Sequence, residues 1–353
     1  MKPCSKNLVI GTALAVSSGV VQAVELDFYG QINQAMMATD NGTDSETFIV
    51  DNTSSSTRVG LVAAHEVDDL TFGAHFEAQF QSNPSNKVTS TTKSISPEFE
   101  ERHVNVFVKG AFGKISIGQG DGAANGNVER DLSRTSVISF TNPSLLGGNI
   151  NFIDANSSTT VALKKAMSDL DFESRYDRLR YDLPKLGGFQ VAVSHGVKAN
   201  NNVTEIGARR LFDLGSGGHL FAGAGYSVES KGGTAGDEVT VGGSASWRAK
   251  SGFNLTAAYS TVSDDNPANP DADFYTVKAG YILNKKNAVS VRYAVANDLV
   301  SEGDTADSIV LGYVHSPTKN IDLYAGYGIH GLDRSGANFD DISVLTTGLR
   351  VKF

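Results

Sequence analysis

Residues 70–80 read LTFGAHFEAQF, and the alternation in this stretch decides the fold. One side of it carries only apolar residues, at every second position: Leu70, Phe72, Ala74, Phe76, Ala78 and Phe80. The other side carries Thr71, Gly73, His75, Glu77 and Gln79. A period of two residues is typical of a strand with one face on an apolar phase and the other face in water. That apolar phase is either a protein core or a membrane.

The same alternation recurs along the chain, at 188–196 (GFQVAVSHG), 275–283 (YTVKAGYIL), 288–295 (AVSVRYAV), 321–329 (IDLYAGYGI) and 346–353 (TTGLRVKF). The polar faces repeatedly carry charges and glycines, and the apolar faces repeatedly end in an aromatic residue. This pattern favours strands that lie between lipid and a water-filled lumen, with aromatic residues at the membrane interfaces.

The first 23 residues have the layout of a secretory signal peptide. Lys2 and Lys6 precede an apolar run over 8–21, and residues 21–23 form an A-x-A-like cleavage site. An N-terminal membrane anchor is the alternative, but the apolar run is short for a membrane span. We therefore expect a signal peptide at 1–23 and a mature barrel domain at 24–353.

Removal of this segment changes the composition of the chain. The formal net charge becomes −9 − 2 = −11, because both lysines are lost, and an acidic chain disfavours a nucleic-acid partner. The one cysteine, Cys4, is also removed, so the mature chain has no disulfide and no cysteine metal site.

The spacing predicts sixteen antiparallel strands, at 25–38, 55–65, 69–82, 99–109, 112–119, 173–183, 188–198, 202–213, 217–229, 236–249, 252–263, 273–283, 286–297, 306–316, 320–331 and 340–353. Every second connection is a tight turn, and most of the others are longer and polar, such as 41–56 and 82–98. Short turns on one rim and long loops on the other are the plan of an outer-membrane barrel. Closure of the sheet pairs every strand, so no backbone edge is left unsatisfied in lipid.

One connection is far longer than the rest. Residues 119–172 contain no convincing barrel strand, and a loop of this length in a compact domain is usually functional or disordered. It is expected to fold inward and narrow the aqueous channel that sixteen strands enclose. The alternatives are an ordinary surface loop or an unrecognised pair of strands at 147–164.

Five segments together resemble the general diffusion porins of Gram-negative bacteria: FYGQINQAMM (28–37), TRVGLVAAHEVDDLTFGAHFEAQF (57–80), RHVNVFVKGAFGKISIGQ (102–119), LRYDLPKLGGFQVAVSHG (179–196) and the C-terminal TTGLRVKF. The resemblance implies an all-β, sixteen-stranded transmembrane β-barrel that assembles as a homotrimer in the outer membrane, in contact with lipid and lipopolysaccharide. It also implies a third loop that folds into the barrel and forms an eyelet. Phe353 resembles the family's C-terminal signal, which the outer-membrane assembly machinery reads.

The resemblance further implies the residues of the eyelet, where a basic wall faces acids on the loop. By position in the matching segments, the basic residues are Arg58, Arg102 and Arg180, and the acidic residues are Glu129, Asp131 and, as a weaker choice, Asp121.

Strand parity agrees with only part of this assignment. Parity places Arg58 and Arg180 on the lumen side. Arg102 shares its parity with three valines, so the alternation does not support a lumen position for it. Four further residues are expected to line the lumen: Glu77, Arg178, Arg292 and Arg350. Opposed rows of charge across a constriction would tune ion selectivity. The alternative is that these arginines are solvated lumen residues paired with nearby acids.

The predicted function is passive diffusion of ions and small hydrophilic solutes, with no cofactor and no metal. Two alternatives remain: a substrate-specific channel with a sugar or anion site on the same barrel, and a secreted, soluble β-sandwich or adhesin. An enzyme is not indicated, because the seven histidines are scattered and neither H-E-x-x-H nor G-x-S-x-G occurs. The acidic segment 264–273 is either a Ca²⁺ ligand set or, as we expect, a solvated loop.

Overall fold

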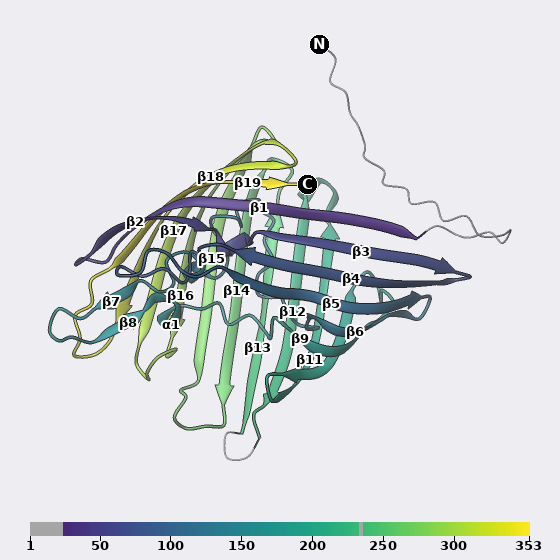
Figure 1. Cartoon of the computed structure of the whole chain (residues 1–353), viewed down its shortest axis with the longest axis horizontal. Helices are drawn as coiled ribbons and strands as arrows, with labels where there is room; N and C mark the ends of the chain where they lie inside the picture. The colour runs from purple at the N-terminus through teal and green to yellow at the C-terminus, as the bar shows by residue number, and fades with distance from the viewer. Residues whose placement is uncertain (1–23, 233–235) are drawn as a thin grey trace, which may run out of the picture.

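The computed structural model describes residues 24–232 and 236–353, and the expected signal peptide at 1–23 lies outside them. The described chain forms a closed antiparallel barrel (Figure 1). Seventeen strands form its sheet, and two of them, β2 and β3, lie end to end along β1, which leaves 17 − 1 = 16 barrel positions. The sheet closes where β19 pairs with β1. The predicted sixteen-stranded barrel is confirmed.

The barrel strands are β1 (Glu25–Asp40), β2 (Ser45–Asp51), β3 (Arg58–Val67), β4 (Leu70–Gln81), β5 (Glu98–Gly110), β6 (Gly113–Asp121), β9 (Arg175–Asp182), β10 (Gln190–Lys198), β11 (Asn201–Asp213), β12 (His219–Ser230), β13 (Asp237–Arg248), β14 (Phe253–Asp264), β15 (Ala272–Leu283), β16 (Asn287–Asn297), β17 (Thr305–Thr318), β18 (Ile321–Asp333) and β19 (Ile342–Lys352). A separate hairpin, β7 (Asn151–Ile153) and β8 (Thr160–Ala162), is followed by the one-turn helix α1 (Leu163–Ala166).

The apolar faces point out of the barrel, as the alternation predicts. Exposed apolar residues follow each other at every second position, for example Phe72 and Phe76 on β4 or Tyr275 and Val277 on β15. Their neighbours in sequence, such as Glu77 and Lys278, are buried on the inward face. The β-sandwich alternative is therefore wrong, because its apolar faces would pack on each other.

The first connection is shorter than the sequence pattern suggested. Residues 45–51 were expected in a long loop, but they form β2, with Phe48 and Val50 buried and Ile49 exposed between them. The strand is interrupted at Thr53–Ser55 by a single 3₁₀ turn, which the side chain of Asn52 caps by accepting a hydrogen bond from Ser54 N. Because of this interruption, the alternation over 45–51 is too short to be recognised as part of a barrel strand.

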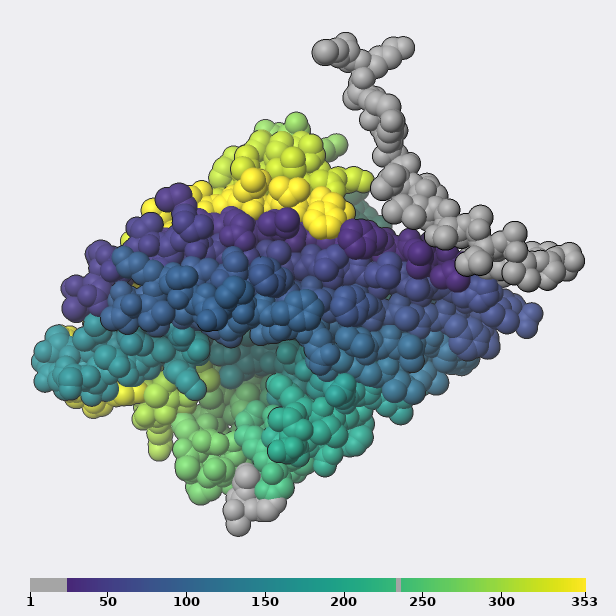
Figure 2. Space-filling model, viewed as in Figure 1, coloured from purple at the N-terminus to yellow at the C-terminus, as the bar shows by residue number. Residues whose placement is uncertain are grey.

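The two rims differ in the length of their connections. On the rim that carries the strand ends near Val24 and Phe353, the seven connections are two to seven residues long; we call it the turn rim. The other rim carries the two longest connections, 82–97 and 122–174, although its connection at 199–200 is also short. The yellow C-terminal end packs directly beside the purple β1 in Figure 2. In outer-membrane barrels short turns face the periplasm and longer loops the exterior. Within the described residues, no helix is long and apolar enough to cross a membrane.

The inward face is not polar along its whole height. On β1, β15 and β19 it carries apolar residues such as Met37, Phe274 and Val344, which belong to one buried cluster. Residues 137–167 supply the other half of that cluster, including Ile138, Phe152 and Leu163. Part of the lumen is thus filled by a hydrophobic core, which the alternation along the strands does not predict.

Candidate functional site

The connection between β6 and β9, residues 122–174, is bound to the inward face of the barrel by serine side chains. Near its start, Ala123 N donates to Ser194 Oγ of β10 at 2.8 Å. Further along, Leu132 N donates to Ser246 Oγ of β13 at 2.9 Å. Additional bonds join Thr135 to Ser290 of β16 and Leu170 to Ser260 of β14. These four strands therefore hold the segment against their polar side.

Inward-facing glycines let the segment approach the wall. A Cβ atom on Gly225 would lie 2.7 Å from the Cβ of Ala124, and one on Gly326 would lie 2.4 Å from Ile138. Real Cβ atoms do not approach so closely, and Gly207 and Gly242 make similar contacts with the segment. The glycines on the polar faces thus provide the space that the segment occupies.

An ion pair fixes the segment at its middle. Lys278 Nζ on β15 lies 2.6 Å from Asp131 Oδ2 and also donates to the carbonyl of Ser139 at 2.7 Å. Although burial alone would raise it, Lys278 and the hydrogen bonds from Ser133 lower the pKa of Asp131 to about 2. Asp131 is therefore a structural anchor of the segment, and it does not line the cavity described next.

A cavity of about 620 Å³ lies between the segment and the strands β3 to β5. Four of the six predicted constriction residues line it: Arg58, Arg102, Asp121 and Glu129. The other charged residues of its lining are Lys87, Glu98, Glu100, Asp169, Asp171, Glu173, Arg175 and Lys198. Basic residues on the wall and acidic residues on the segment therefore meet in one space.

We call Arg58, Arg102 and Arg175 the basic wall. Glu77 contacts two of these arginines. Arg102 Nε donates to Glu77 Oε1, and Arg58 Nε lies 3.6 Å from Glu77 Oε2. Tyr29 also donates to Glu77, at 2.8 Å. Arg175 Nη1 lies 3.8 Å from Asp121 Oδ1, so the three guanidinium groups of the wall outnumber the two carboxylates that pair with them.

A β-bulge places Arg102 on the lumen side. In the pairing of β4 with β5, Glu77 lies opposite His103 and Ala78 lies opposite Glu101, so Arg102 is the extra residue. A bulge inserts one residue and redirects the side chains around it. Arg102 can thus point inward although Val104 and Val106, which share its parity, point outward.

The acidic side of the cavity is a group of carboxyls on the segment, Glu129, Asp169 and Asp171. Gly126 N and Val128 N donate to Asp171 at 2.6 and 3.0 Å, which folds the segment back on itself. Burial, followed by the charge of Asp171, raises the pKa of Glu129 well above its usual range. Burial and Asp169 raise the pKa of Asp171 to about 8. At neutral pH the group therefore carries less charge than three separate carboxylates.

Arg180 and Arg178 do not belong to the basic wall. Arg180 pairs with Asp182 at 2.7 Å and donates to the carbonyl of Gly122 at 2.8 Å, and it is not in the cavity lining. Arg178 is buried and donates to the carbonyls of Gly118 and Asp121. Both arginines thus hold the root of the 122–174 segment.

The other residues expected in the lumen lie on the inward face, where each is enclosed. Arg350 pairs with Asp322 at 2.7 Å and donates to Ser55 Oγ at 2.7 Å. Arg292 is buried behind the segment, beside Ile138 and His330, and two of its nitrogens have no hydrogen-bond partner among the described residues. Neither lines the 620 Å³ cavity.

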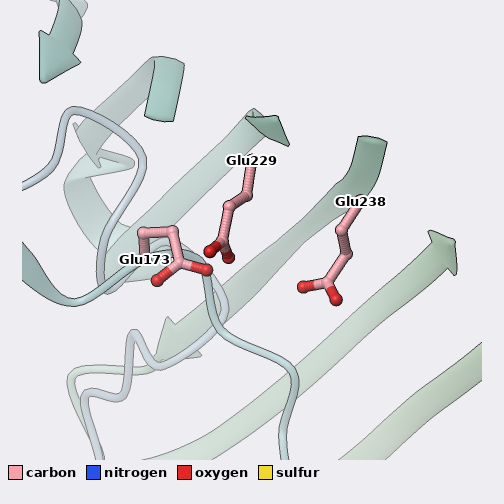
Figure 3. A group of neighbouring side chains, drawn as sticks. All are labelled: Glu173, Glu229 and Glu238. Atoms are coloured by element: carbon pink, nitrogen blue, oxygen red, sulfur yellow. The ribbon is translucent and has the colours of Figure 1, made fainter. Parts of the chain in front are cut away.

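Three further carboxylates meet at the loop rim. Glu173, Glu229 and Glu238 point toward one another, with ligand atoms within 4.8 Å (Figure 3). Each already has a partner: Lys198 bonds to Glu173, Asn201 to Glu229 at 2.6 Å, and Lys231 to Glu238 at 2.6 Å. Since amines and an amide satisfy the group, we assign no metal to it. The carboxylates of 264–273 form no comparable group in the described residues.

The sequence reasoning missed Arg175, Asp169 and Asp171. Arg175 has the parity of the outward residues Asp177 and Leu179, but it lies at the first position of β9, where the chain comes out of the segment. Alternation does not hold at a strand end, and no periodicity covers the segment itself. The acidic string at 169–173 was the one signal available.

Comparisons with known proteins agree with this architecture. A family model described as Gram-negative porin matches residues 11–333. The chain is similar to the solved anion-selective porin from Comamonas acidovorans, at 18% identity and a TM-score of 0.63, over 94% of this chain and 100% of that one. It is also similar to OmpF of Salmonella typhi in complex with daunomycin, at 15% identity and a TM-score of 0.63, over 93% of this chain and 97% of that one.

A third similar structure is the trimer form of OmpT of Vibrio cholerae, at 18% identity and a TM-score of 0.59, over 94% of this chain and 100% of that one. No curated protein sequence matches the chain. At these identities the structural likeness establishes the fold, and it carries no information on the solute.

Proposed function

Because the chain belongs to the Gram-negative porin family, whose members are channels of the outer membrane and not enzymes, we propose that it conducts ions and small hydrophilic solutes by passive diffusion. The observation that carries the proposal is the cavity between the 122–174 segment and the basic wall. Rings of charge in a narrow aqueous passage set which solutes pass. The segment acts as the constriction loop, and the basic wall and the acidic side act as its two charged faces.

The lining of this cavity also contains uncharged polar groups. Serine and threonine at 53–56, with Gln79 and Gln81, line the cavity beside the charged residues. Hydroxyl and amide groups can exchange hydrogen bonds with many solutes, and no aromatic ladder for sugars lines the cavity within the described residues. This composition favours general diffusion over a site for one solute.

We infer the oligomeric state from a similar porin structure. OmpT of Vibrio cholerae, a similar structure, is described in a trimer form. We extend this to the present chain as a homotrimer in lipid and lipopolysaccharide. Phe353 serves as the assembly signal: its backbone exchanges two 3.0 Å hydrogen bonds with Gly30, and its ring, which is 55% exposed, stacks on Phe28 at the turn rim.

Liposome swelling tests the diffusion proposal. In vesicles that contain the purified protein, swelling rates should fall smoothly as uncharged sugars increase in size, because an unspecific passage discriminates by radius alone. Protein-free vesicles are the control. A rate that saturates for one sugar would point instead to a substrate-specific channel, and vesicles that do not swell at all would exclude an open pore.

A further inference from the structure

A second charged cavity lies at the turn rim, outside the constriction. Its volume is about 420 Å³, and it is lined by the turns after β11, β13 and β15 together with one residue of the 122–174 segment. Its charged and titratable residues are all basic: Arg134, His219, Arg248, Lys250 and Lys285. We call this group the lower cationic cavity.

The cations of this cavity are not neutralised by the protein. Within residues 24–232 and 236–353, Arg134, Arg248, Lys250 and Lys285 form no ion pair, whereas most arginines around the constriction do. The carboxylate opposite His219 in the strand register, Asp213, accepts a hydrogen bond from Gly215 N in its own turn and is not in the lining. Like charges that gather without a counterion repel each other unless an anion joins them.

The geometry holds these groups toward the lumen. His219 and Arg248 are paired across β12 and β13, and they share the inward side with Phe221 and Ser246, which contact the 122–174 segment. Arg134 reaches the cavity from that segment and donates from Nη1 to the carbonyl of Lys285 at 2.8 Å. Its backbone lies in the left-handed region, with φ at 69°, which non-glycine residues rarely adopt. The hydrogen bond to Lys285 thus ties the guanidinium to the turn rim.

We propose that the lower cationic cavity binds a phosphate group of a soluble anion at the periplasmic exit of the pore. Arginine and lysine donors that converge from several elements suit a multivalent oxyanion better than a monovalent one. At the loop rim, by contrast, the cations Lys198 and Lys231 are already paired with carboxylates, so they attract an anion less than the unpaired cations of the lower cationic cavity. The site therefore fills from the periplasm.

Calorimetric titration with inorganic pyrophosphate tests the proposal on the purified protein in neutral detergent at low ionic strength. The wild type should bind pyrophosphate, and the affinity should fall as salt is added. The double variant Lys250→Gln and Lys285→Gln should bind about tenfold more weakly, since two charges close to the anion are lost. Both lysines are exposed turn residues, so the substitutions leave the barrel intact.

The matched control removes two lysines from other turns of the same rim, Lys185→Gln and Lys319→Gln, which are also exposed and form no ion pair in the described chain. This control should bind as the wild type does. Equal weakening in both double variants would show a diffuse attraction to the rim and overturn the proposal, as would a wild type that does not bind pyrophosphate.

Two further experiments test whether the phosphate group belongs to a soluble anion or a lipid headgroup, and from which rim the anion enters. Addition of phosphatidylglycerol to the micelles should leave the wild-type binding unchanged; complete competition would assign the cavity to lipid headgroups and overturn the proposal. In planar bilayers, pyrophosphate should reduce the current more from the turn-rim side than from the loop-rim side, and an equal reduction would contradict the assigned position. Neither experiment depends on size selection at the constriction. The liposome-swelling test of diffusion and the binding test of the lower cationic cavity can therefore fail independently.

Discussion

Replacing Lys278 with methionine should release the middle of the 122–174 segment from the barrel wall. The side chains of Lys278 and Asp131 are 4% and 5% exposed, and the pair spans 147 residues of sequence. Removal of one partner from a buried ion pair leaves an uncompensated charge, which costs about 3–5 kcal/mol. The expected result is faster hydrogen exchange over residues 126–140 and a noisier single-channel current, because the segment then samples detached positions.

Two matched variants make this prediction specific. Lys93→Met also breaks an ion pair, with Glu46, but Lys93 is 55% exposed in the loop after β4, where such pairs contribute only about 0–1 kcal/mol. The combination of Lys278→Met with Asp131→Leu should recover much of the protection, because apolar replacement of both partners is often neutral. Equal effects of Lys278→Met and Lys93→Met would contradict the anchoring role.

Neutralising the basic wall should change ion selectivity more than any other set of substitutions. In the triple variant Arg58→Gln, Arg102→Gln and Arg175→Gln, three cations leave a passage that Glu129, Asp169 and Asp171 face. Charged clefts produce potentials of several kT, so the permeability ratio of K⁺ to Cl⁻ should rise about three- to tenfold. Reversal potentials of single channels in a KCl gradient measure this ratio.

Arg334→Gln is the control for the wall. Arg334 lies in the loop after β18, paired with Asp304 at 2.6 Å, and it does not line the cavity. Its loss should leave the reversal potential nearly unchanged. A triple wall variant with the wild-type reversal potential, or one shifted toward anions, would exclude the basic wall from the selectivity filter.

Alternation predicted the barrel because lipid on one side and water on the other act on every strand in the same way. It failed where a local feature interrupts the period. The 3₁₀ turn at Thr53–Ser55 interrupts the alternation between β2 and β3, so β2 was not predicted. The bulge in β5 places Arg102 on the lumen side, whereas its parity predicts the lipid side. The bulge can be described only once the neighbouring strand is in place, since it is defined by its partner.

The constriction was less predictable than the barrel. Asp131 and Glu129 are two residues apart in the same loop, yet one is bound to Lys278 in the wall and the other lines the cavity. Arg180 likewise serves the root of the segment, although its parity is that of a lumen residue. These differences depend on contacts between distant parts of the chain, for which a single sequence has no periodic signal.

The central claim is that the 122–174 segment lies against the inward face of the barrel, and a disulfide measures this most directly. A Cβ atom on Gly312 would lie 3.1 Å from the Cβ of Ser139, close to the roughly 3.5–4.5 Å of a disulfide. The variant Ser139→Cys with Gly312→Cys should therefore crosslink under mild oxidation, with no free thiol left in the denatured protein. Ser139→Cys with Leu311→Cys, whose side chain points outward, should keep both thiols. Free thiols in the Gly312 pair, or a crosslink in the Leu311 pair, would show that the segment does not lie inside the barrel.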